Sequence, residues 1–309
     1  MSSSIVVVGV PIALGGNLPG DSSVVRGMAE APAGLRKLGF LDRLAAGSLA
    51  GRTIRDVGDM PIEPGYRDDP DRRAKNRSLI SAALPRVADV VAGALRDGGV
   101  EARLLVLGGD CTAHPAAIAG ISRARPGARI ALVWFDAHGD FNTPDTTPSG
   151  NVWGMPFAMA CGRGDADLVA AVGGPVVREE DCALIGGQVL DEIESRMLAA
   201  SPVAQFGAGM LATDAGMAAL ASWARVVAGR VDGFYVAIDH DCLDASVRPA
   251  VAMPEPYGLM PDTAIAAVRA ITAAGLVIGH GATTISLGNG DAERTVAIAV
   301  DLAAVSLAL

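Results

Sequence analysis

Three side chains of the kinds that bind metal ions stand at alternate positions shortly after an apolar run at 130–135. They are Asp136, His138 and Asp140. The run has the composition of a buried strand and is too short for a typical helix. Alternate residues of an extended chain point to the same side, so these side chains are expected to leave the strand end together. Carboxylate oxygen and imidazole nitrogen bind divalent first-row ions. The alternative is a polar strand-to-helix loop with a capping Asp.

A second acidic pair follows another apolar run, at 235–238. Asp239 and Asp241 are again two residues apart and are expected to share a face. Two strands that end in converging carboxylates need positive charge between them, because like charges repel. A pair of divalent ions with bridging carboxylates meets this need, and such two-metal sites activate a bridging water. We therefore expect most of the remaining chain to be scaffold for this site.

The composition limits the classes of protein. The chain has 309 residues, half of them hydrophobic, which is enough for one large α/β domain or two small ones. A net charge of −9 without a Lys/Arg-rich run argues against a nucleic-acid partner. The start lacks the features of a signal peptide, and we expect no membrane span. The cysteines contain no C-x-x-C pair and predict a reduced, cytoplasmic protein: Cys111, Cys161, Cys182 and Cys242.

Strands and helices are expected to alternate along the whole chain. Expected strands are 5–10, 53–57, 102–107, 130–135, 182–185, 234–238 and 276–278. Expected helices are 32–46, 72–96 with a break or kink at Pro85, 114–122, 261–274 and 293–307. The alternation predicts an α/β fold with a parallel sheet, and the continuously apolar strands indicate that both faces are covered. Ligands of such sheets bind at the carboxyl ends of the strands.

Three stretches carry a resemblance to a known family. Segments 108–111, 136–156 and 239–244 resemble the signature stretches of the arginase/agmatinase (ureohydrolase) family, and 8–11, 31–36 and 56–59 resemble its N-terminal part. The resemblance spans most of the chain. It implies one arginase-like domain over 1–309, a three-layer α/β/α fold with a central parallel sheet, and two Mn²⁺ ions as cofactor. It also implies hydrolysis of a small guanidino or related amidine compound to urea and an amine, by a homo-oligomer (trimer or hexamer).

The resemblance assigns roles to the acidic clusters. Asp136 and Asp239 would bridge the two ions, Asp140 would bind the first, and His138 and Asp241 would bind the second. Substrate-side positions are Asn142, Ser149, Asn151, Asp191 and Glu194, and Asp244 matches an outer carboxylate that supports the metal cluster. A guanidinium carbon is a poor electrophile, so the reaction needs an activated water and an acid that helps the amine to leave.

Three positions depart from the family pattern. Cys111 replaces a His ligand of the first metal; it is either a soft thiolate ligand, which suits Mn²⁺ less well, or a small buried residue. Trp153, which we place with Asp140 among the catalytic positions, replaces the His expected to transfer a proton. Indole cannot do so, but it can stack on a planar cation or simply fill the pocket. Thr284 replaces the Glu that holds the guanidinium, and a hydroxyl cannot replace a carboxylate there.

Two of the remaining histidines lie near these motifs. His114 follows the Cys111 loop and could reach the site, or it could be structural. His240 lies between two ligand carboxylates and is expected to point to the opposite face, in a structural role.

Two functions from different classes remain open. The first is a metal-dependent amidinohydrolase with an altered substrate, such as a modified guanidine; a hydroxyguanidine is one candidate. The second is a non-catalytic partner or regulatory subunit that keeps the fold and one metal. A hydrolase of another C–N bond is a third, more distant reading.

Overall fold

The protein is built on one eight-stranded sheet in which every strand pairing is parallel. The computed structural model describes residues 4–16, 23–47, 49–62 and 71–308. The strand order is β2-β1-β3-β8-β7-β4-β5-β6. The strands are β1 (Ile5–Val10), β2 (Ile54–Asp59), β3 (Arg103–Gly108), β4 (Ile130–Asp136), β5 (Cys182–Gly186), β6 (Ala204–Phe206), β7 (Gly233–Asp239) and β8 (Val277–Thr283). This confirms the predicted α/β class and parallel sheet.

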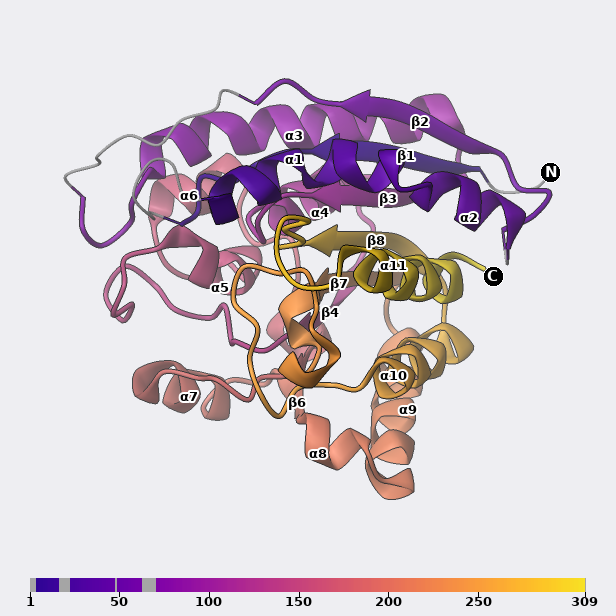
Figure 1. Ribbon diagram of the computed structural model, residues 1–309. Coiled ribbons are helices and arrows are strands. Elements are labelled where there is room, and N and C mark those ends of the chain that lie inside the picture. Colours follow the sequence, from indigo (N-terminus) through magenta and orange to yellow (C-terminus); the bar gives the residue numbers. More distant parts are fainter. Residues whose placement is uncertain (1–3, 17–22, 48, 63–70, 309) are drawn as a thin grey trace.

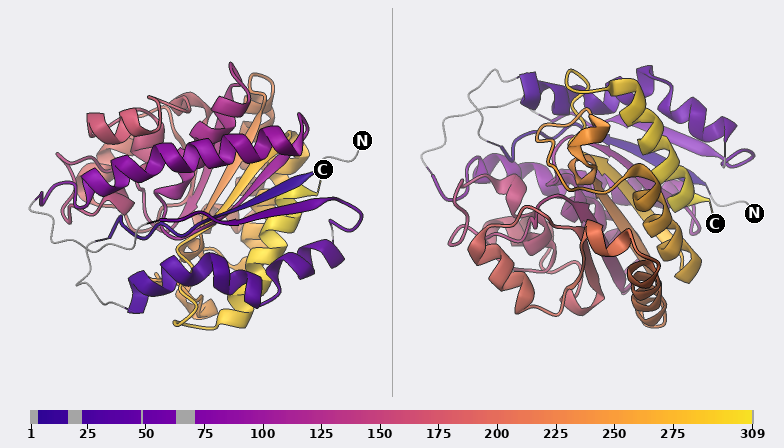
Figure 2. Two further views of the ribbon diagram at one scale, coloured as in Figure 1. Left: turned by 90° about the horizontal axis from the view of Figure 1, so that it is seen from above. Right: turned by 60° about the horizontal axis from the view of Figure 1, so that its bottom comes forward.

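Helices cover both faces of the sheet, so the fold has the three layers expected (Figures 1 and 2). One face carries α3 (Arg77–Gly98), α4 (Ala113–Ala124), α5 (Pro156–Ala160), α6 (Ala166–Ala171) and α7 (Glu192–Ala199). The other carries α1 (Ser23–Lys37), α2 (Phe40–Ala46), α8 (Ala208–Leu211), α9 (Asp214–Ala228), α10 (Pro261–Ala274) and α11 (Ala292–Leu307). Alternate strand residues serve the two cores: in β1, Val6 and Val8 face α3, and Ile5 and Val7 face α11.

Two helices differ from the prediction for reasons of backbone chemistry. The helix expected at 32–46 is two helices, because Gly39 adopts a left-handed conformation (φ 75°) between α1 and α2. A break or kink was expected at Pro85. The helix does not break there, since α3 runs continuously through this residue. Its carbonyl oxygen accepts a hydrogen bond from Arg123 in α4.

Several elements between 152 and 228 have no counterpart in the prediction. β6 has only three residues, too few for a pattern. α9 was detectable, because its buried residues Gly216, Leu220, Ala224 and Val227 have helical spacing and Thr213 caps its first turn.

The helix α3 has the length and composition of a membrane span, which corrects the expectation that no stretch has them. It is the one such helix among the described residues. Half of its most apolar window is buried, because Leu84, Val87 and Val91 belong to the core between α3, α4 and the sheet. Its apolarity is therefore explained by packing.

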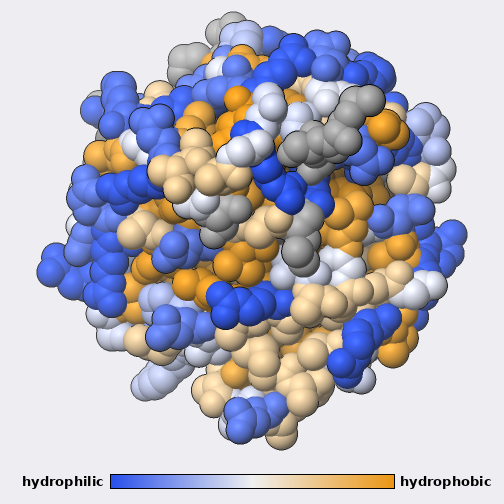
Figure 3. Space-filling model, turned by 90° about the vertical axis from the view of Figure 1, so that its right-hand side faces the viewer, coloured by the Kyte–Doolittle hydropathy of each residue, from blue (hydrophilic) through white to orange (hydrophobic). Residues whose placement is uncertain are grey.

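The carboxyl ends of the strands gather at one edge of the molecule. The arrowheads of β1, β2, β3 and β8 point to the left in Figure 1, away from the two termini. The opposite face, at the amino ends, mixes hydrophilic and hydrophobic residues (Figure 3). The candidate site residues follow five strands that are neighbours in the sheet: β3, β8, β7, β4 and β5.

Candidate metal centre

The strand register brings the two acidic clusters to one level. Phe135 of β4 pairs with Ile238 of β7, so the next residues, Asp136 and Asp239, end neighbouring strands side by side. Asp239 in turn pairs with Thr283 of β8. Cys111 follows β3 on the far side of β8. The parallel sheet thus supplies the convergence that the motifs alone only suggested.

Tight turns, and not extended chain, bring the alternate residues together. Asp136 is the last residue of β4, and its Oδ1 accepts a hydrogen bond from the backbone N–H of His138 (2.7 Å). Asp140 adopts a left-handed conformation with φ 48°. Asp239 ends β7, and its Oδ1 accepts from the N–H of Asp241 (2.8 Å) within the 3₁₀ turn His240–Cys242. The predicted convergence is present, but the assumed strand geometry was wrong.

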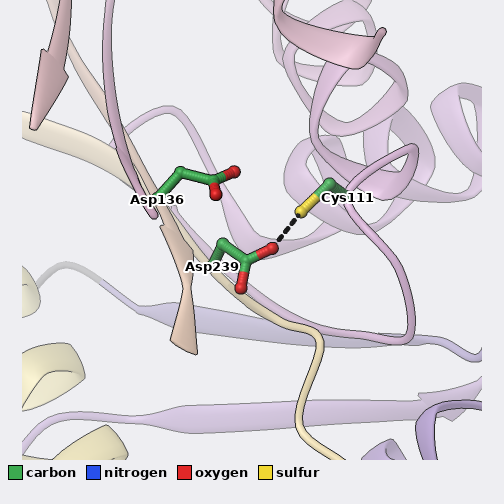
Figure 4. Close-up of side chains that lie close together, drawn as sticks. All are labelled: Cys111, Asp136 and Asp239. Carbon is green, nitrogen blue, oxygen red and sulfur yellow. Dashed lines mark hydrogen bonds between the residues drawn. The ribbon is translucent and has the colours of Figure 1, made fainter. Parts of the chain in front are cut away.

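Two groups of ligand atoms share one carboxylate. Cys111, Asp136 and Asp239 form one group, and Asp136, His138 and Asp241 form the other; within each group the atoms lie within 4.8 Å of one another. Figure 4 shows Asp136 and Asp239 on their strand ends, with Cys111 facing them from its loop. The Cys111 thiol donates a hydrogen bond to Oδ2 of Asp239 (2.8 Å). A carboxylate common to two groups is suited to hold two divalent ions close together.

The imidazole of His138 lies between two carboxylates. Its Nδ1 is 3.2 Å from Oδ1 of Asp136 and 3.3 Å from Oδ2 of Asp241. Burial lowers the pKa of His138, but the hydrogen bonds and charges of Asp136 and Asp241 outweigh burial and raise it. The two carboxylates thus favour the protonated ring, and His138 would have to give up a proton to serve as a metal ligand.

The remaining carboxylates have too little positive charge around them. Burial, followed by the charges of neighbouring aspartates, raises the pKa of Asp140 and of Asp239 well above the ordinary value. Burial and Asp136 raise the pKa of Asp241 to about 6. Oδ2 of Asp140 is buried without a hydrogen-bond partner. A buried acidic cluster with an orphaned oxygen fits divalent cations.

Two donors that the sequence interpretation missed form hydrogen bonds with the carboxylates of Asp136 and Asp239. The indole N–H of Trp134 donates to Oδ2 of Asp136 (2.9 Å). The sequence could have predicted this contact, because Trp134 precedes Asp136 by two residues and lies on the same face of the strand. The Thr284 hydroxyl donates to Oδ1 of Asp239. Thr284 has φ 60°, a strained conformation for a β-branched residue, and no sequence pattern indicates it.

The other histidines do not contribute ligand atoms. His114 is fully buried, and its Nε2 lies 3.0 Å from Oγ1 of Thr283, which lies 3.4 Å from the sulfur of Cys111. Its contact with the site is therefore indirect, and burial lowers its pKa to about 3. His240 is buried with Nδ1 3.1 Å from the carbonyl oxygen of Thr283, consistent with a structural role.

Asp244, expected to be an outer carboxylate, accepts hydrogen bonds from the backbone of its own loop. Its Oδ1 accepts from the N–H of Ser246 (2.9 Å) and its Oδ2 from the N–H of Gly258 (3.0 Å). It therefore closes the loop between β7 and α10, and it is not part of either ligand group.

A pocket of about 320 Å³ opens over the cluster. Asp136 is not among the residues that line this pocket. The other predicted site residues line it: Cys111, His138, Asp140, Asn142, Ser149, Asn151, Trp153, Asp191, Glu194, Asp239 and Asp241. Thr284, Met28 and Met253 complete much of the rest. The volume suits a small molecule.

The residues predicted to bind substrate also form hydrogen bonds within the protein. Asn142 donates to Oδ2 of Asp191 (3.0 Å). Asp191 and Glu194 form a capping box at the start of α7. Glu194 also accepts from the N–H of Phe141 (2.9 Å), and burial raises its pKa to about 7. Ser149 accepts from the N–H of Asn151 (3.1 Å).

Trp153 packs on a glycine platform. The backbone N–H of Trp153 donates to the carbonyl oxygen of Gly15 (3.1 Å), and the backbone N–H of Gly15 donates to Oδ2 of Asp110 (2.7 Å). A Cβ atom on Gly16 would lie 2.1 Å from the six-membered ring of Trp153. The ring therefore fits only because residue 16 has no side chain.

Comparisons with known proteins agree with this architecture. A model of the arginase family matches residues 3–308. The arginase of Bacillus subtilis is 30% identical over 278 residues, covering 90% of this chain and 88% of that protein. The arginase of Bacillus caldovelox is 31% identical over 257 residues, covering 82% and 81%. A solved structure of the Bacillus caldovelox arginase superposes with a TM-score of 0.86 at 28% identity, and the match covers 98% of both chains. The chain therefore belongs to the arginase (ureohydrolase) family.

Proposed function

We propose that the protein is a hydrolase with a two-metal centre that cleaves a C–N bond of a guanidino or modified guanidino compound, releasing urea or a substituted urea. The observation that carries this proposal is the carboxylate of Asp136, which belongs to both ligand groups beneath the pocket. Family membership supports the reaction class.

The chemistry divides between the ions and the chain. When bound, two divalent ions would supply Lewis acidity and lower the pKa of a water molecule. Asp136 and Asp239 would hold both ions, with Trp134 and Thr284 fixing the orientation of these carboxylates. Asp140 is the carboxylate with an oxygen free of hydrogen bonds, so we assign to its Oδ2 the transfer of a proton to the leaving amine.

The nature of the ions depends on Cys111. Two Mn²⁺ ions are the proposal, because five of the six proposed ligands offer oxygen or nitrogen atoms: the four residues other than Cys111 in the two ligand groups, and Asp140, which interacts with Asp136 and Asp239. A thiolate at the sixth position would bind softer ions such as Zn²⁺ more tightly. Metal content after equilibration with each ion distinguishes the two cases.

The two ends of the pocket suggest the type of substrate. Asn142, Ser149, Asn151 and Asp191 provide polar groups for an amino-acid head. Near the metal cluster, Thr284 and Trp153 are neutral, and the hydroxyl of Thr284 already donates to Asp239. The carboxylates that line the pocket there are proposed metal ligands apart from Glu194, whose oxygens accept hydrogen bonds from the backbone N–H groups of Phe141 and Asp191. A weakly basic amidine, such as a hydroxyguanidine, fits this end better than a guanidinium that needs its own carboxylate partner.

Turnover of a guanidino panel by the Mn²⁺-loaded protein tests the proposal. We expect product from a modified guanidine, loss of at least 100-fold in kcat/KM in Asp136→Asn, and no effect of Asp145→Asn, an exposed control. Failure of the protein to bind any divalent ion, or equal activity in Asp136→Asn, would contradict it.

A non-catalytic partner subunit is the second candidate. Trp153 on its glycine platform favours it, because it replaces a proton-transferring residue with an aromatic wall. This reading predicts no metal-dependent turnover by the protein alone and co-purification with an active relative.

We further propose that the chain is a single-domain, cytoplasmic homo-oligomer, a trimer or hexamer. Light scattering of the purified protein tests the assembly, and a monomeric mass at micromolar concentration would exclude it.

A further inference from the structure

We propose that Glu255 is a positioning residue that orients His138 for metal binding. The inference rests on the proposed two-metal function. Oε1 of Glu255 lies 4.0 Å from Nε2 of His138, while Nδ1 of the same ring faces Asp136 and Asp241. One ring nitrogen of His138 therefore faces the carboxylate cluster, and the other faces the carboxylate of Glu255 in a different loop.

The chemistry of imidazole explains why the second contact matters. A neutral imidazole that gives its Nδ1 lone pair to a metal must carry its proton on Nε2. A carboxylate near Nε2 fixes that tautomer, holds the ring plane and makes Nδ1 a more basic ligand. The gap of 4.0 Å exceeds a direct hydrogen bond, and a small rotation of the Glu255 side chain would be needed to close it.

The loop that carries Glu255 is tied to the turn that carries Asp241. The N–H of Ala245 donates to the carbonyl oxygen of Glu255 (2.9 Å), and the N–H of Leu259 donates to that of Cys242 (2.7 Å). Pro254 and Pro256 flank Glu255 and restrict its backbone. The loop is thus fixed at both ends and presents Glu255 to His138 in a defined position.

Glu255 is distinct from the residues proposed to bind the metal ions or the substrate. Glu255 is absent from both ligand groups and from the lining of the pocket, and its side chain is 29% exposed. It therefore acts on the second metal through His138 and not by touching substrate. Its removal is expected to affect the ion held by His138 and Asp241 more than the ion held by Cys111, Asp136 and Asp239.

Calorimetric titration of the full chain with Mn²⁺ tests this role. In Glu255→Gln and Glu255→Ala we expect the affinity for one of the two ions to fall by about 10- to 100-fold, and the affinity for the other to stay within about 3-fold. Glu255→Asp, which keeps the charge on a shorter side chain, is expected to recover part of the loss through a bridging water. Asp262→Asn, which removes an exposed charge shortly after the same loop, is the matched control.

The outcomes separate this inference from the proposed function. Wild-type affinity for both ions in Glu255→Gln overturns the role of Glu255 and leaves the proposed function standing. An equal loss at both sites together with a lowered Tm also overturns it, because a purely structural residue would behave so. A wild-type protein that binds no ion overturns the proposed function itself. A loss confined to one ion, with unchanged Tm and partial recovery in Glu255→Asp, supports the inference.

Discussion

The thiol of Cys111 lies 2.8 Å from Oδ2 of Asp239, and both residues belong to one ligand group. Burial raises the pKa of Cys111 well above its usual value, and the charges of Asp239, Asp140 and Asp136 raise it further. The thiol therefore keeps its proton and donates a hydrogen bond to the carboxylate of Asp239. Cys111 and Asp239 would together hold a cation at this place, and the thiol would have to lose its proton to serve as a ligand.

The first prediction concerns the choice of metal. Cys111→His is expected to bind two Mn²⁺ ions at least tenfold more tightly than wild type, because imidazole suits Mn²⁺ better than a thiolate. The same variant should lose affinity for Zn²⁺ relative to Mn²⁺. Competitive titration measures both constants. Cys111→Ala is the control, and an unchanged Zn²⁺ affinity in it would mean that the sulfur is not a ligand.

The second prediction concerns the hydrogen bond of Trp134 to Asp136. Trp134→Phe keeps the stacking of the ring on Phe157 but removes the N–H donor. We expect a metal affinity about 10- to 100-fold weaker and a free energy of unfolding lower by about 1–3 kcal/mol. Phe157→Leu, which alters packing and leaves the donor, is the control. Equal metal affinities in wild type and Trp134→Phe would refute the positioning role.

The third prediction links Gly16 to Trp153. Gly16→Ala places a methyl group 2.1 Å from the Trp153 ring, so the ring must move into the pocket and substrate binding should weaken at least tenfold. In Trp153→His the smaller ring makes room, and adding Gly16→Ala should then cost less than threefold. Substrate KM in this double-mutant cycle measures the coupling. Additive effects would show that the two residues do not interact.

The sequence was sufficient for the sheet and most metal-type residues because both leave local patterns. The buried parallel strands β4 and β7 are continuous apolar runs, and Asp136 and Asp239 stand directly at their ends. The helix boundary at Gly39 and the short strand β6 were missed because tertiary packing and a positive φ decide them.

Long-range contacts account for what the sequence could not supply. Thr284 was read as a missing carboxylate, yet its hydroxyl supports Asp239 from a neighbouring strand. Glu255 and His138 are 117 residues apart in the sequence and meet only because the loop after β7 returns to β4. No local pattern encodes such pairs, so only the assembled sheet reveals them.

The final prediction concerns the pH dependence of stability. His280 is fully buried in β8; its Nδ1 lies 2.9 Å from the hydroxyl of Ser306, and its Nε2 has no hydrogen-bond partner. Burial, aided by His240 and His114, lowers its pKa to about 3. In the unfolded chain the pKa is about 6.5, so below that pH the unfolded state binds a proton that the folded state does not. The contribution of neutral His280 to the free energy of unfolding is therefore complete above pH 6.5 and is lost as the pH falls towards 3.

Because of this one histidine, the free energy of unfolding should be about 2 kcal/mol lower at pH 5 than at pH 7. Replacement by a neutral amide, His280→Gln, should reduce the difference between pH 7 and pH 5 by about that amount, whatever it does to absolute stability. Urea unfolding of both proteins with a chelator present, so that metal release does not contribute, measures the two differences. Identical pH dependence in wild type and variant would mean that His280 is already protonated in the folded protein, or that it does not titrate differently on unfolding.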